Sequence, residues 1–345
     1  MLNSLLHNEI KEKGPLSQSR FMEIALQHPE LGYYQTHEAI GQDFTTSPEI
    51  SQVFGELIGA WALDYYTKIN CPKNLTLVEL GPGKGTLMAD FLRIARLGPS
   101  FFKALKIYLV ETNLPLKKYQ KEALAGPFTW LNGFEELPLT THPVIIIANE
   151  FLDTFPTNLF KRKRNTVFER CISLRDGNLA FSDVERRKED GPDEIWEESP
   201  QTETLLHAIC SRLQSCGGCF LCIDYGYEEG RGDTLQALRE GEFVSPFYQV
   251  GKSDLTCHVN FTRLKEIASS YNVGILGPGP QGQFLKNLGV DLRIQLLKNQ
   301  NPSKSTALDV ALTRLTHPLQ MGTIFKAMVL FSPLNPTPSG FELCF

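Results

Sequence analysis

The fold is decided by the stretch Leu75-Thr76-Leu77-Val78-Glu79-Leu80-Gly81-Pro82-Gly83-Lys84-Gly85. An apolar run reaches the acid Glu79 and then enters a turn with glycine at positions 81, 83 and 85. Closely spaced glycines let the backbone turn sharply and approach a ligand where side chains would interfere. The stretch therefore predicts a buried strand followed by a cofactor-binding turn made by Gly81, Gly83 and Gly85.

The spacing of the glycines separates this turn from two common phosphate-binding motifs. A dinucleotide fingerprint counted from Gly81 needs glycine at position 86, where the chain has Thr86, and a P-loop needs serine or threonine after Lys84. The remaining pattern, with a carboxylate upstream, resembles the first motif of class I S-adenosylmethionine (SAM) methyltransferases. SAM carries an ammonium group and no phosphate, so Glu79 is suited to accept a hydrogen bond from it.

A second acid follows the next apolar run. Ile107-Tyr108-Leu109-Val110 ends in Glu111, and an acid at this place in α/β folds accepts hydrogen bonds from ribose hydroxyls. Residues 86–97 between the two strands are expected to form the crossover helix. The alternative is a tight turn between strand and helix that binds no ligand.

Alternation of apolar runs with helical patterns predicts an α/β fold with a doubly wound sheet. In such sheets ligands bind outside the carboxyl ends of the strands. The expected strands are Leu75 to Leu80, Ile107 to Glu111, Phe128 to Leu131, Val144 to Ala148, Cys219 to Asp224 and Thr323 to Phe331.

Polar residues follow the apolar run Val144 to Ala148. Asn149 is expected to contact the cofactor, whereas Glu150 and Asp153 are suited to hold a cationic guanidinium. Two carboxylates can bind its planar fork and offset its repulsion from a sulfonium. The alternative is that Asn149 caps a helix and the two acids lie on the surface.

The N-terminal part predicts two helices and a covering segment. Residues 1–13 carry leucines at helical spacing, which indicates an amphipathic packing helix. In Gly41 to Ser51, Thr46 with Glu49 fits a capping box and Ser47 with Pro48 fits an N-cap, so a helix is expected from here to about Tyr66. This segment is either a capped helix alone or also a lid over the cofactor, with Thr45 and Ser47 as binding residues.

The pattern changes between residues 158 and 200. Arg175-Asp176-Gly177-Asn178 predicts the turn of a β-hairpin, and the charged residues 184–194 predict an exposed loop. The sequence thus suggests an N-terminal helical segment and lid (1–70), a first part of the sheet domain (71–157), an inserted hairpin and charged loop (158–205), and the remainder of the sheet domain with substrate-lobe elements (206–335).

Composition narrows the class of protein. The chain has 345 residues, 42% hydrophobic and 21% charged, and a net charge of −5, which is typical of globular proteins and argues against nucleic-acid binding. The basic run 161–164 is expected in a solvated strand or hairpin, or alternatively at a docking site for an acidic partner. No apolar run reaches the length of a membrane span, and no secretion signal or transit peptide is recognisable. We therefore expect a cytoplasm-like compartment.

Four of the eight cysteines cluster, at positions 210, 216, 219 and 222. They could suggest a metal or iron-sulfur site. Cys219 and Cys222, however, are expected on one buried strand, where side chains three apart point to opposite faces. Buried, reduced thiols and no metal site are the expectation.

Taken together, the motifs resemble the MidA family of SAM-dependent methyltransferases. The matching blocks are residues 32–34, 43–51, 54–56, 79–85, 149–153, 223–226, 254–261, 281–285 and 321–322. The resemblance implies a class I methyltransferase fold with an added α+β lobe, and an arginine of a protein as the methyl acceptor, with symmetric dimethylarginine as the expected product. Mitochondrial members of the family assist assembly of respiratory complex I, so a complex I subunit homologue is the implied partner.

Residues 254–261 contain His258, a candidate proton acceptor whose alternative role is that of a hydrogen-bonded packing residue. Asn260 and Cys257 depart from the family's pattern, which has an acid and an alanine there. Two other functions stay open: an assembly factor that binds SAM with little or no catalysis, and a methyltransferase of small molecules.

Overall fold

The computed structural model describes residues 1–36, 45–229 and 232–342. The chain divides into two compact units. We call the unit made of Thr45–Phe151, Leu205–Gly226 and Phe261–Phe345 the sheet unit, and the unit made of Met1–Phe44, Leu152–Thr204 and Tyr227–Asn260 the accessory unit.

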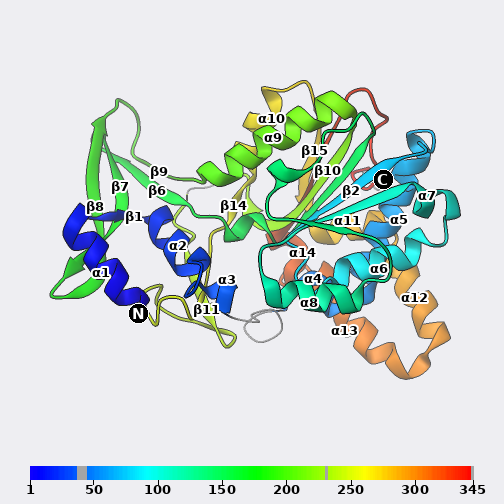
Figure 1. The fold of residues 1–345 in the computed structure, drawn as a ribbon, viewed down its shortest axis with the longest axis horizontal. Helices are drawn as coiled ribbons and strands as arrows, with labels where there is room; N and C mark the ends of the chain where they lie inside the picture. Colours follow the sequence, from blue (N-terminus) through cyan, green and yellow to red (C-terminus); the bar gives the residue numbers. More distant parts are fainter. Residues whose placement is uncertain (37–44, 230–231, 343–345) are drawn as a thin grey trace. The chain divides into compact units, whose positions relative to one another are not determined.

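The sheet unit is built on a mixed sheet with the strand order β15-β16-β10-β5-β2-β3-β4 (Figure 1). Neighbours from β4 to β10 are parallel, whereas β16 is antiparallel to both β10 and β15. The strands are β2 (Leu75–Leu80), β3 (Leu105–Val110), β4 (Thr129–Leu131), β5 (Val144–Asn149), β10 (Gly218–Tyr227), β15 (Gly274–Pro280) and β16 (Phe325–Phe331). The doubly wound α/β sheet predicted from the sequence is confirmed.

The order of these strands fixes where a ligand can bind. From β2 the chain continues outward through β3 and β4 on one side, and then returns to the other side of β2 to form β5. The strand order therefore reverses between β2 and β5, and in open α/β sheets the crevice at such a reversal is the ligand site.

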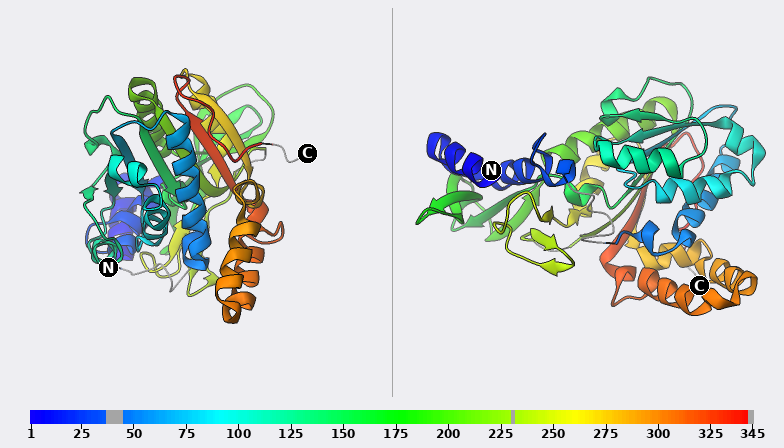
Figure 2. Two further views of the ribbon diagram at one scale, coloured as in Figure 1. Left: turned by 90° about the vertical axis from the view of Figure 1, so that its right-hand side faces the viewer. Right: turned by 60° about the horizontal axis from the view of Figure 1, so that its bottom comes forward.

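Helices cover the sheet and bury its apolar faces. They are α4 (Ser47–Ile50), α5 (Gln52–Lys68), α6 (Thr86–Ala95), α7 (Pro99–Ala104), α8 (Leu114–Ala123), α9 (Pro200–Cys216), α10 (Phe261–Ser269), α11 (Gln281–Asn287), α12 (Val290–Gln300), α13 (Ser305–Thr316) and α14 (Met321–Ile324), with short 3-10 turns at Phe134–Glu136 and Pro302–Lys304. The pair α12 and α13 is the orange region in both views of Figure 2.

Two glycines let α5 and α6 approach each other closely. A Cβ atom at Gly55 would lie 2.8 Å from the carbonyl oxygen of Leu87, and one at Gly59 would lie 2.8 Å from that of Phe91. Both distances are shorter than van der Waals contact, so larger residues would push the two helices apart. This packing holds α6, and with it the turn that precedes α6, against the core of the sheet unit.

The helix expected from residue 46 or 47 to Tyr66 is wrong in one respect, because the structure divides it into α4 and α5. Ser51 has an extended backbone with φ −161°, and its hydroxyl accepts a hydrogen bond from Val53 N at 3.3 Å as the N-cap of α5. Thr46 makes no side-chain cap on α4. The capping box with Glu49 is therefore absent, because Glu49 instead pairs with the hydroxyl of Thr86.

The accessory unit has an antiparallel sheet of order β1-β7-β6-β9, with β8 paired to β7. The predicted hairpin is confirmed: Asp176 and Gly177 have φ of 51° and 77°, as a tight turn between β7 and β8 requires. These strands are β1 (Leu16–Ser17), β6 (Asn158–Lys163), β7 (Thr166–Arg175), β8 (Asn178–Lys188) and β9 (Glu194–Glu198).

The remaining elements of this unit are helical or short. They are α1 (Leu2–Lys13), α2 (Gln18–Gln27), α3 (Tyr33–Thr36), a 3-10 turn at Leu152–Thr154, β11 (Gln236–Arg239), β12 (Glu242–Phe243), β13 (Asp254–Thr256) and β14 (Val259–Asn260). The packing role predicted for residues 1–13 is confirmed, since Leu2, Leu6 and Ile10 of α1 are buried in the hydrophobic core of this unit.

Of the two expectations for the charged segments, one needs correction. Residues 184–194 are not a single exposed loop, because β8 continues to Lys188 and β9 begins at Glu194. Cross-strand ion pairs make this possible: Arg186 contacts Glu169 of β7 at 2.6 Å, and Arg162 of β6 contacts Glu194 at 2.6 Å. The basic run 161–164 lies in β6 and its turn, as predicted.

The clustered cysteines are buried and form no disulfide among the described residues, as expected from the strand position of Cys219 and Cys222 in β10. Burial raises the pKa of Cys210 to about 12. Over residues 1–36, 45–229 and 232–342, the structure has no group of three or more metal-ligating side chains. In the same residues, every helix is too short or too polar to cross a bilayer.

Candidate functional site

The three glycines of the predicted turn adopt backbone conformations that other residues avoid. Gly81, Gly83 and Gly85 have φ of 64°, 55° and 85°, in the left-handed region that favours glycine. A Cβ atom at Gly81 would lie 2.5 Å from Cδ2 of Phe151. The turn after β2 therefore needs glycine both for its backbone angles and for the space around it.

Glu79 is a buried acid beside this turn, with a side chain 3% exposed. Its Oε2 atom is buried and has no hydrogen-bond partner among the described residues. Burial and, to a smaller extent, the charge of Glu111 raise the pKa of Glu79 to about 8. A buried acceptor without a donor is costly, so the site is suited to a ligand that brings a donor or a positive charge.

Glu111 follows β3, the neighbour of β2, and both of its carboxylate oxygens are engaged. Oε1 accepts a hydrogen bond from Asn113 N at 2.8 Å, and Oε2 accepts one from Gln120 Nε2 at 3.2 Å. Burial raises the pKa of Glu111, while these hydrogen bonds act in the opposite direction. The carboxylate is thus held in one orientation at the carboxyl edge of the sheet.

Asn149 ends β5, on the other side of β2. Its Oδ1 atom is a second buried acceptor without a partner among the described residues, and its Nδ2 lies 3.2 Å from Oε1 of Glu150. Glu150 has φ of 50° and donates its backbone N–H to Ile223 O at 2.9 Å. The two unsatisfied oxygens of Glu79 and Asn149 thus belong to the strands that flank the reversal of strand order.

The structure brings Ser47 to the predicted site residue Glu150. The backbone N–H of Ser47 donates to Oε1 of Glu150 at 2.7 Å, and Ser47 itself is fully buried. At the other end of α4, Glu49 accepts a hydrogen bond from Thr86, the first residue of α6 after the glycine turn. The short helix α4 is therefore attached both to the end of β5 and to the start of α6.

The structure describes one part of the predicted lid and not the other. Thr45 is exposed. Residues 41–44, which begin the proposed lid and include the motif residues Asp43 and Phe44, lie outside the described residues.

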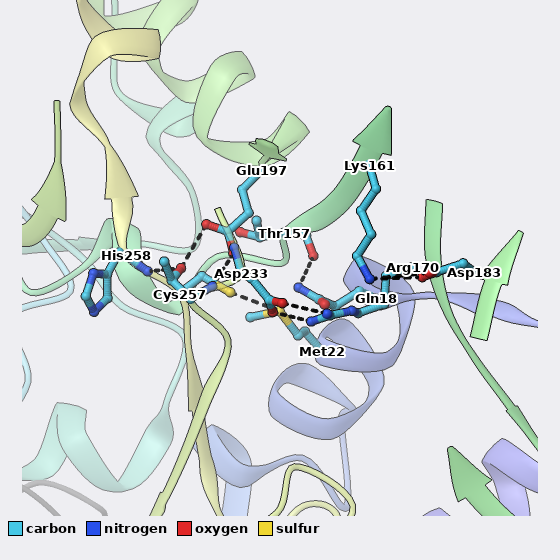
Figure 3. A network of polar contacts seen from close by, with 11 residues as sticks. Gln18, Met22, Thr157, Lys161, Arg170, Asp183, Glu197, Asp233, Cys257 and His258 are labelled. Atoms are coloured by element: carbon cyan, nitrogen blue, oxygen red, sulfur yellow. Dashed lines mark hydrogen bonds and ion pairs between the residues drawn. The ribbon is translucent and has the colours of Figure 1, made fainter. Parts of the chain in front are cut away.

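Asp153 and His258, the other two candidate catalytic residues, belong to the accessory unit. Asp153 is 5% exposed, and its backbone oxygen accepts a hydrogen bond from Cys257 N at 3.0 Å. Figure 3 shows His258 beside Cys257. The backbone N–H of His258 donates to the hydroxyl oxygen of Thr234 at 2.9 Å. The backbone contact thus brings the segments of Asp153 and His258 together.

His258 is held by polar neighbours. Its Nε2 lies 2.9 Å from Nε2 of Gln236, which makes this ring nitrogen the acceptor of the amide N–H. Thr234 in turn donates to Glu197 at 2.8 Å. Burial lowers the pKa of His258, against the opposite effect of Glu197. The imidazole is therefore neutral at pH 7, as a proton acceptor must be.

One residue that the sequence reasoning did not find is Gln120. Among the described residues of α8 it is the one buried side chain, and its amide contacts Gly83, Glu111 and Trp130. Its signal in the sequence is weak: a glutamine stands at the inward position of a helix where an apolar residue is usual.

The chemistry of this edge of the sheet fits SAM. The turn after β2 contains three glycines with positive φ, and two buried oxygens, of Glu79 on β2 and Asn149 on β5, have no partner among the described residues. These oxygens can accept the donors of an amino-acid tail. Glu111 stands one strand further, where the ribose hydroxyls of such a ligand bind in related folds. Comparison with known proteins agrees, since residues 57–279 match the family described as "Putative S-adenosyl-L-methionine-dependent methyltransferase". The chain belongs to this family, known as MidA.

Relatives of this MidA protein carry a more specific name. The mitochondrial protein arginine methyltransferase NDUFAF7 of Danio rerio is 32% identical, over 96% of this chain and 86% of its own length. The protein of the same name from Homo sapiens is 29% identical, over 96% and 83%. These matches extend over nearly the whole chain, so they include both units.

A solved structure shares the fold. A crystal structure of a superfamily member from Burkholderia thailandensis, bound to S-adenosyl-homocysteine, is 22% identical and has a TM-score of 0.82 over 99% of this chain and 92% of its own. The chain is accordingly a SAM-dependent methyltransferase with the class I fold and an added antiparallel lobe.

Proposed function

We propose that this enzyme transfers methyl groups from SAM to the ω-nitrogens of arginine in a protein. The observation that carries the proposal is the similarity of about 30% to proteins named arginine methyltransferases, which extends over 96% of the chain. A match over 96% of the chain extends beyond the cofactor-binding sheet to both units.

The residues of the sheet unit have distinct tasks in holding SAM. Gly81, Gly83 and Gly85 leave room for the ligand, and Glu79 accepts a hydrogen bond from its ammonium group. Glu111 accepts hydrogen bonds from the ribose hydroxyls.

The β5 side of the site completes the set of cofactor contacts. Asn149 offers its unsatisfied oxygen to the ligand. Thr45 and Ser47 contact the ligand from the segment that begins α4, which serves as a lid over it.

The residues proposed to bind the methyl-accepting arginine offset the repulsion between two positive charges. When bound, SAM supplies a methyl group on a positively charged sulfur, and a guanidinium that approaches it is also cationic. Carboxylates at Glu150 and Asp153 offset this repulsion and orient the guanidinium plane, so that one nitrogen faces the methyl group. That nitrogen must lose a proton as its new bond forms, and the neutral imidazole of His258 is the acceptor once its Nε2 is released from the amide N–H of Gln236.

Several finer features belong to the same proposal. The product is a symmetric dimethylarginine, and the acceptor is a protein, such as a homologue of a respiratory complex I subunit, in a cytoplasm-like compartment. The hairpin of residues 158–205 acts as an insertion between the two parts of the sheet domain, 71–157 and 206–335, and contributes to recognition of this partner.

Transfer of a labelled methyl group tests the function. The purified enzyme is incubated with methyl-labelled SAM and a lysate that lacks the endogenous enzyme, and the modified residue is mapped by mass spectrometry. The reaction is repeated with Glu150→Gln and with Glu122→Gln, an exposed control on α8. We expect labelled arginine with the wild type and the control, and roughly a tenfold or greater loss of label with Glu150→Gln.

Two other results would replace the proposal. Label in a small molecule and in no protein would indicate a small-molecule methyltransferase. Binding of SAM with no label in any fraction, while a partner protein is still bound, would indicate an assembly factor with little or no catalysis.

A further inference from the structure

Gln120 occupies a position where helices normally bury an apolar side chain. The residue is 0% exposed on α8, whereas its neighbours Lys118, Tyr119, Lys121 and Glu122 are exposed. A carboxamide without hydrogen-bond partners would destabilise the folded protein at such a position. Its retention in the core points to a task other than packing.

The carboxamide makes three hydrogen bonds. Its Nε2 donates to the carbonyl oxygen of Gly83 at 2.7 Å and to Oε2 of Glu111 at 3.2 Å, while its Oε1 accepts from Nε1 of Trp130 at 2.7 Å. Both amide protons and the carbonyl oxygen are thus used.

The chemistry of these partners fixes which way the amide faces. The indole N–H of Trp130 can only donate, so the atom that it contacts must be the oxygen of Gln120. The carbonyl of Gly83 can only accept, so the atom facing it must be the NH₂ group. No rotation of the amide satisfies all three partners in another way.

This amide connects two parts of the site that are far apart in sequence. Gly83 lies in the turn after β2, and Glu111 follows β3; Gln120 is 37 residues from the first and 9 from the second. The backbone of Gln120 also packs on the turn, since a Cβ atom at Gly85 would lie 3.3 Å from its Cα. Side chain and backbone together hold the turn at a fixed place relative to the acid.

We propose that Gln120 is a positioning residue of the cofactor site, which sets the glycine turn and the Glu111 carboxylate in the arrangement that binds the adenosine part of SAM. The proposal rests on the proposed role of Glu111 toward the ribose. Gln120 has no need to touch the cofactor itself.

The hydrogen bond also affects the charge of Glu111. Donation from Gln120 lowers the pKa of this carboxyl, against the larger effect of burial. Loss of the donor therefore makes Glu111 easier to protonate and a poorer acceptor for ribose hydroxyls. A merely structural defect at α8 would have no such dependence on pH.

The test measures binding of S-adenosylhomocysteine by calorimetry at several pH values. The variants are Gln120→Leu, Gln120→Glu, Trp130→Phe and Glu111→Gln, with Gln295→Glu on the exposed face of α12 as a control of equal charge change. We expect affinity to fall about tenfold or more in Gln120→Leu, and further in Gln120→Glu, whose carboxylate would face two acceptors. The affinity of Trp130→Phe for S-adenosylhomocysteine should fall less, and the control should bind as the wild type does.

Coupling to Glu111 completes the test. The double variant Glu111→Gln with Gln120→Leu should lose less affinity than the sum of the two single losses, because Gln120 acts in part through that acid. In Gln120→Leu the loss of affinity on acidification should begin at higher pH than in the wild type.

The possible failures are distinct. Wild-type affinity and pH profile in Gln120→Leu would overturn the role of Gln120, and so would an equal loss at all pH values with full additivity. Wild-type affinity in Glu111→Gln would instead overturn the ribose role of Glu111. Should Gln120→Leu fail to fold, Trp130→Phe decides, because unchanged affinity in that variant contradicts the proposal.

Discussion

Glu79 and Glu111 stand at the carboxyl ends of the adjacent parallel strands β2 and β3, and the charge of one raises the pKa of the other. Both carboxyl groups are buried. Two acids placed in this way destabilise each other until a ligand with donors or positive charge arrives. The arrangement indicates a site built for its ligand at some cost to the ligand-free protein.

Binding of the cofactor should release a proton. With its pKa raised to about 8, Glu79 is mostly protonated at pH 7, and an ammonium group favours the ionised form. We expect affinity for S-adenosylhomocysteine to rise from pH 6 to pH 8, by up to about tenfold per pH unit. Calorimetry in two buffers of different ionisation enthalpy measures the proton, and Glu79→Gln should abolish its release.

The stability of the ligand-free protein should show the opposite trend. The folded-state pKa of Glu79 lies above its ordinary value, so its contribution to the free energy of unfolding is present below about pH 4.5 and is lost as pH rises through 8. Urea titrations of wild type and Glu79→Gln between pH 5 and pH 8 compare the two. A constant difference between them would contradict a raised pKa.

The glycine turn predicts a specific steric defect. In Gly81→Ala the new methyl group would meet Phe151 at 2.5 Å, in addition to the strain of φ 64°. Gly289 has φ of 87° with nothing near its Cβ position, so Gly289→Ala isolates the strain. We expect Gly289→Ala to lose about 1 kcal/mol of unfolding free energy and Gly81→Ala to lose more. Only Gly81→Ala should also lose cofactor affinity, and equal binding by the two would contradict this account.

Glu56 anchors α12 to the core of the sheet unit. Its side chain is 1% exposed and contacts Arg93 at 3.0 Å and Arg293 at 2.8 Å. We expect Glu56→Gln to lower the free energy of unfolding by about 1–3 kcal/mol at pH 7. The loss should lie near the lower end of this range, because Arg93 is half exposed and solvent screens its ion pair.

The pH dependence of the stability loss in Glu56→Gln shows whether charge or packing causes it. Although burial opposes them, the arginines lower the pKa of Glu56 below its ordinary 4.5. Its stabilising effect is thus present above about pH 4.5 and is lost as pH falls through the lowered pKa. Denaturation of both proteins at pH 7 and pH 3 should show the difference shrink in acid, and an unchanged difference would point to packing instead of charge.

Glu150 should have two separable effects. In the structure the backbone N–H of Ser47 donates to Glu150 at 2.7 Å. Glutamine at this position can still accept that hydrogen bond but carries no charge. Glu150→Gln should thus keep the Ser47 amide protected from hydrogen exchange and lower methyl transfer about tenfold or more. Glu150→Ala should lose both, and equal exchange in the two variants would show that Glu150 does not hold α4.

His258 predicts the acid limb of the pH profile. Because burial lowers its pKa from 6.5, the imidazole stays neutral at pH 7, and methyl transfer should decline only below about pH 6.5. His258→Gln should lose turnover and the acid limb together. The rate of transfer between pH 5 and pH 8 is the measurement, and an unchanged rate in this variant would remove His258 from the mechanism.

Local pattern was sufficient for much of the fold. The strands at Leu75–Leu80 and Val144–Asn149 were predicted nearly to the residue, because a run of buried apolar side chains bounded by glycine or polar residues admits few other structures. The hairpin turn at Asp176 and Gly177 was predicted for a similar reason, since few residue pairs tolerate its backbone angles.

Other elements escaped prediction because distant residues decide them. The strand β15, Gly274–Pro280, contains three glycines and two prolines and resembles a loop; pairing with β16 makes it a strand. The break at Ser51 likewise follows from where α4 is attached, through Ser47 to Glu150 across 103 residues of sequence.

The sequence by itself determined the glycine turn, the acids at the strand ends and hence the class of cofactor, because these depend on backbone angles and on neighbours along the chain. Only the tertiary structure showed that the oxygens of Glu79 and Asn149 are buried without partners in the part of the chain that the structure describes, and that Gln120 joins Gly83 to Glu111. Burial and hydrogen bonding between strands depend on how distant segments pack, which no local pattern specifies.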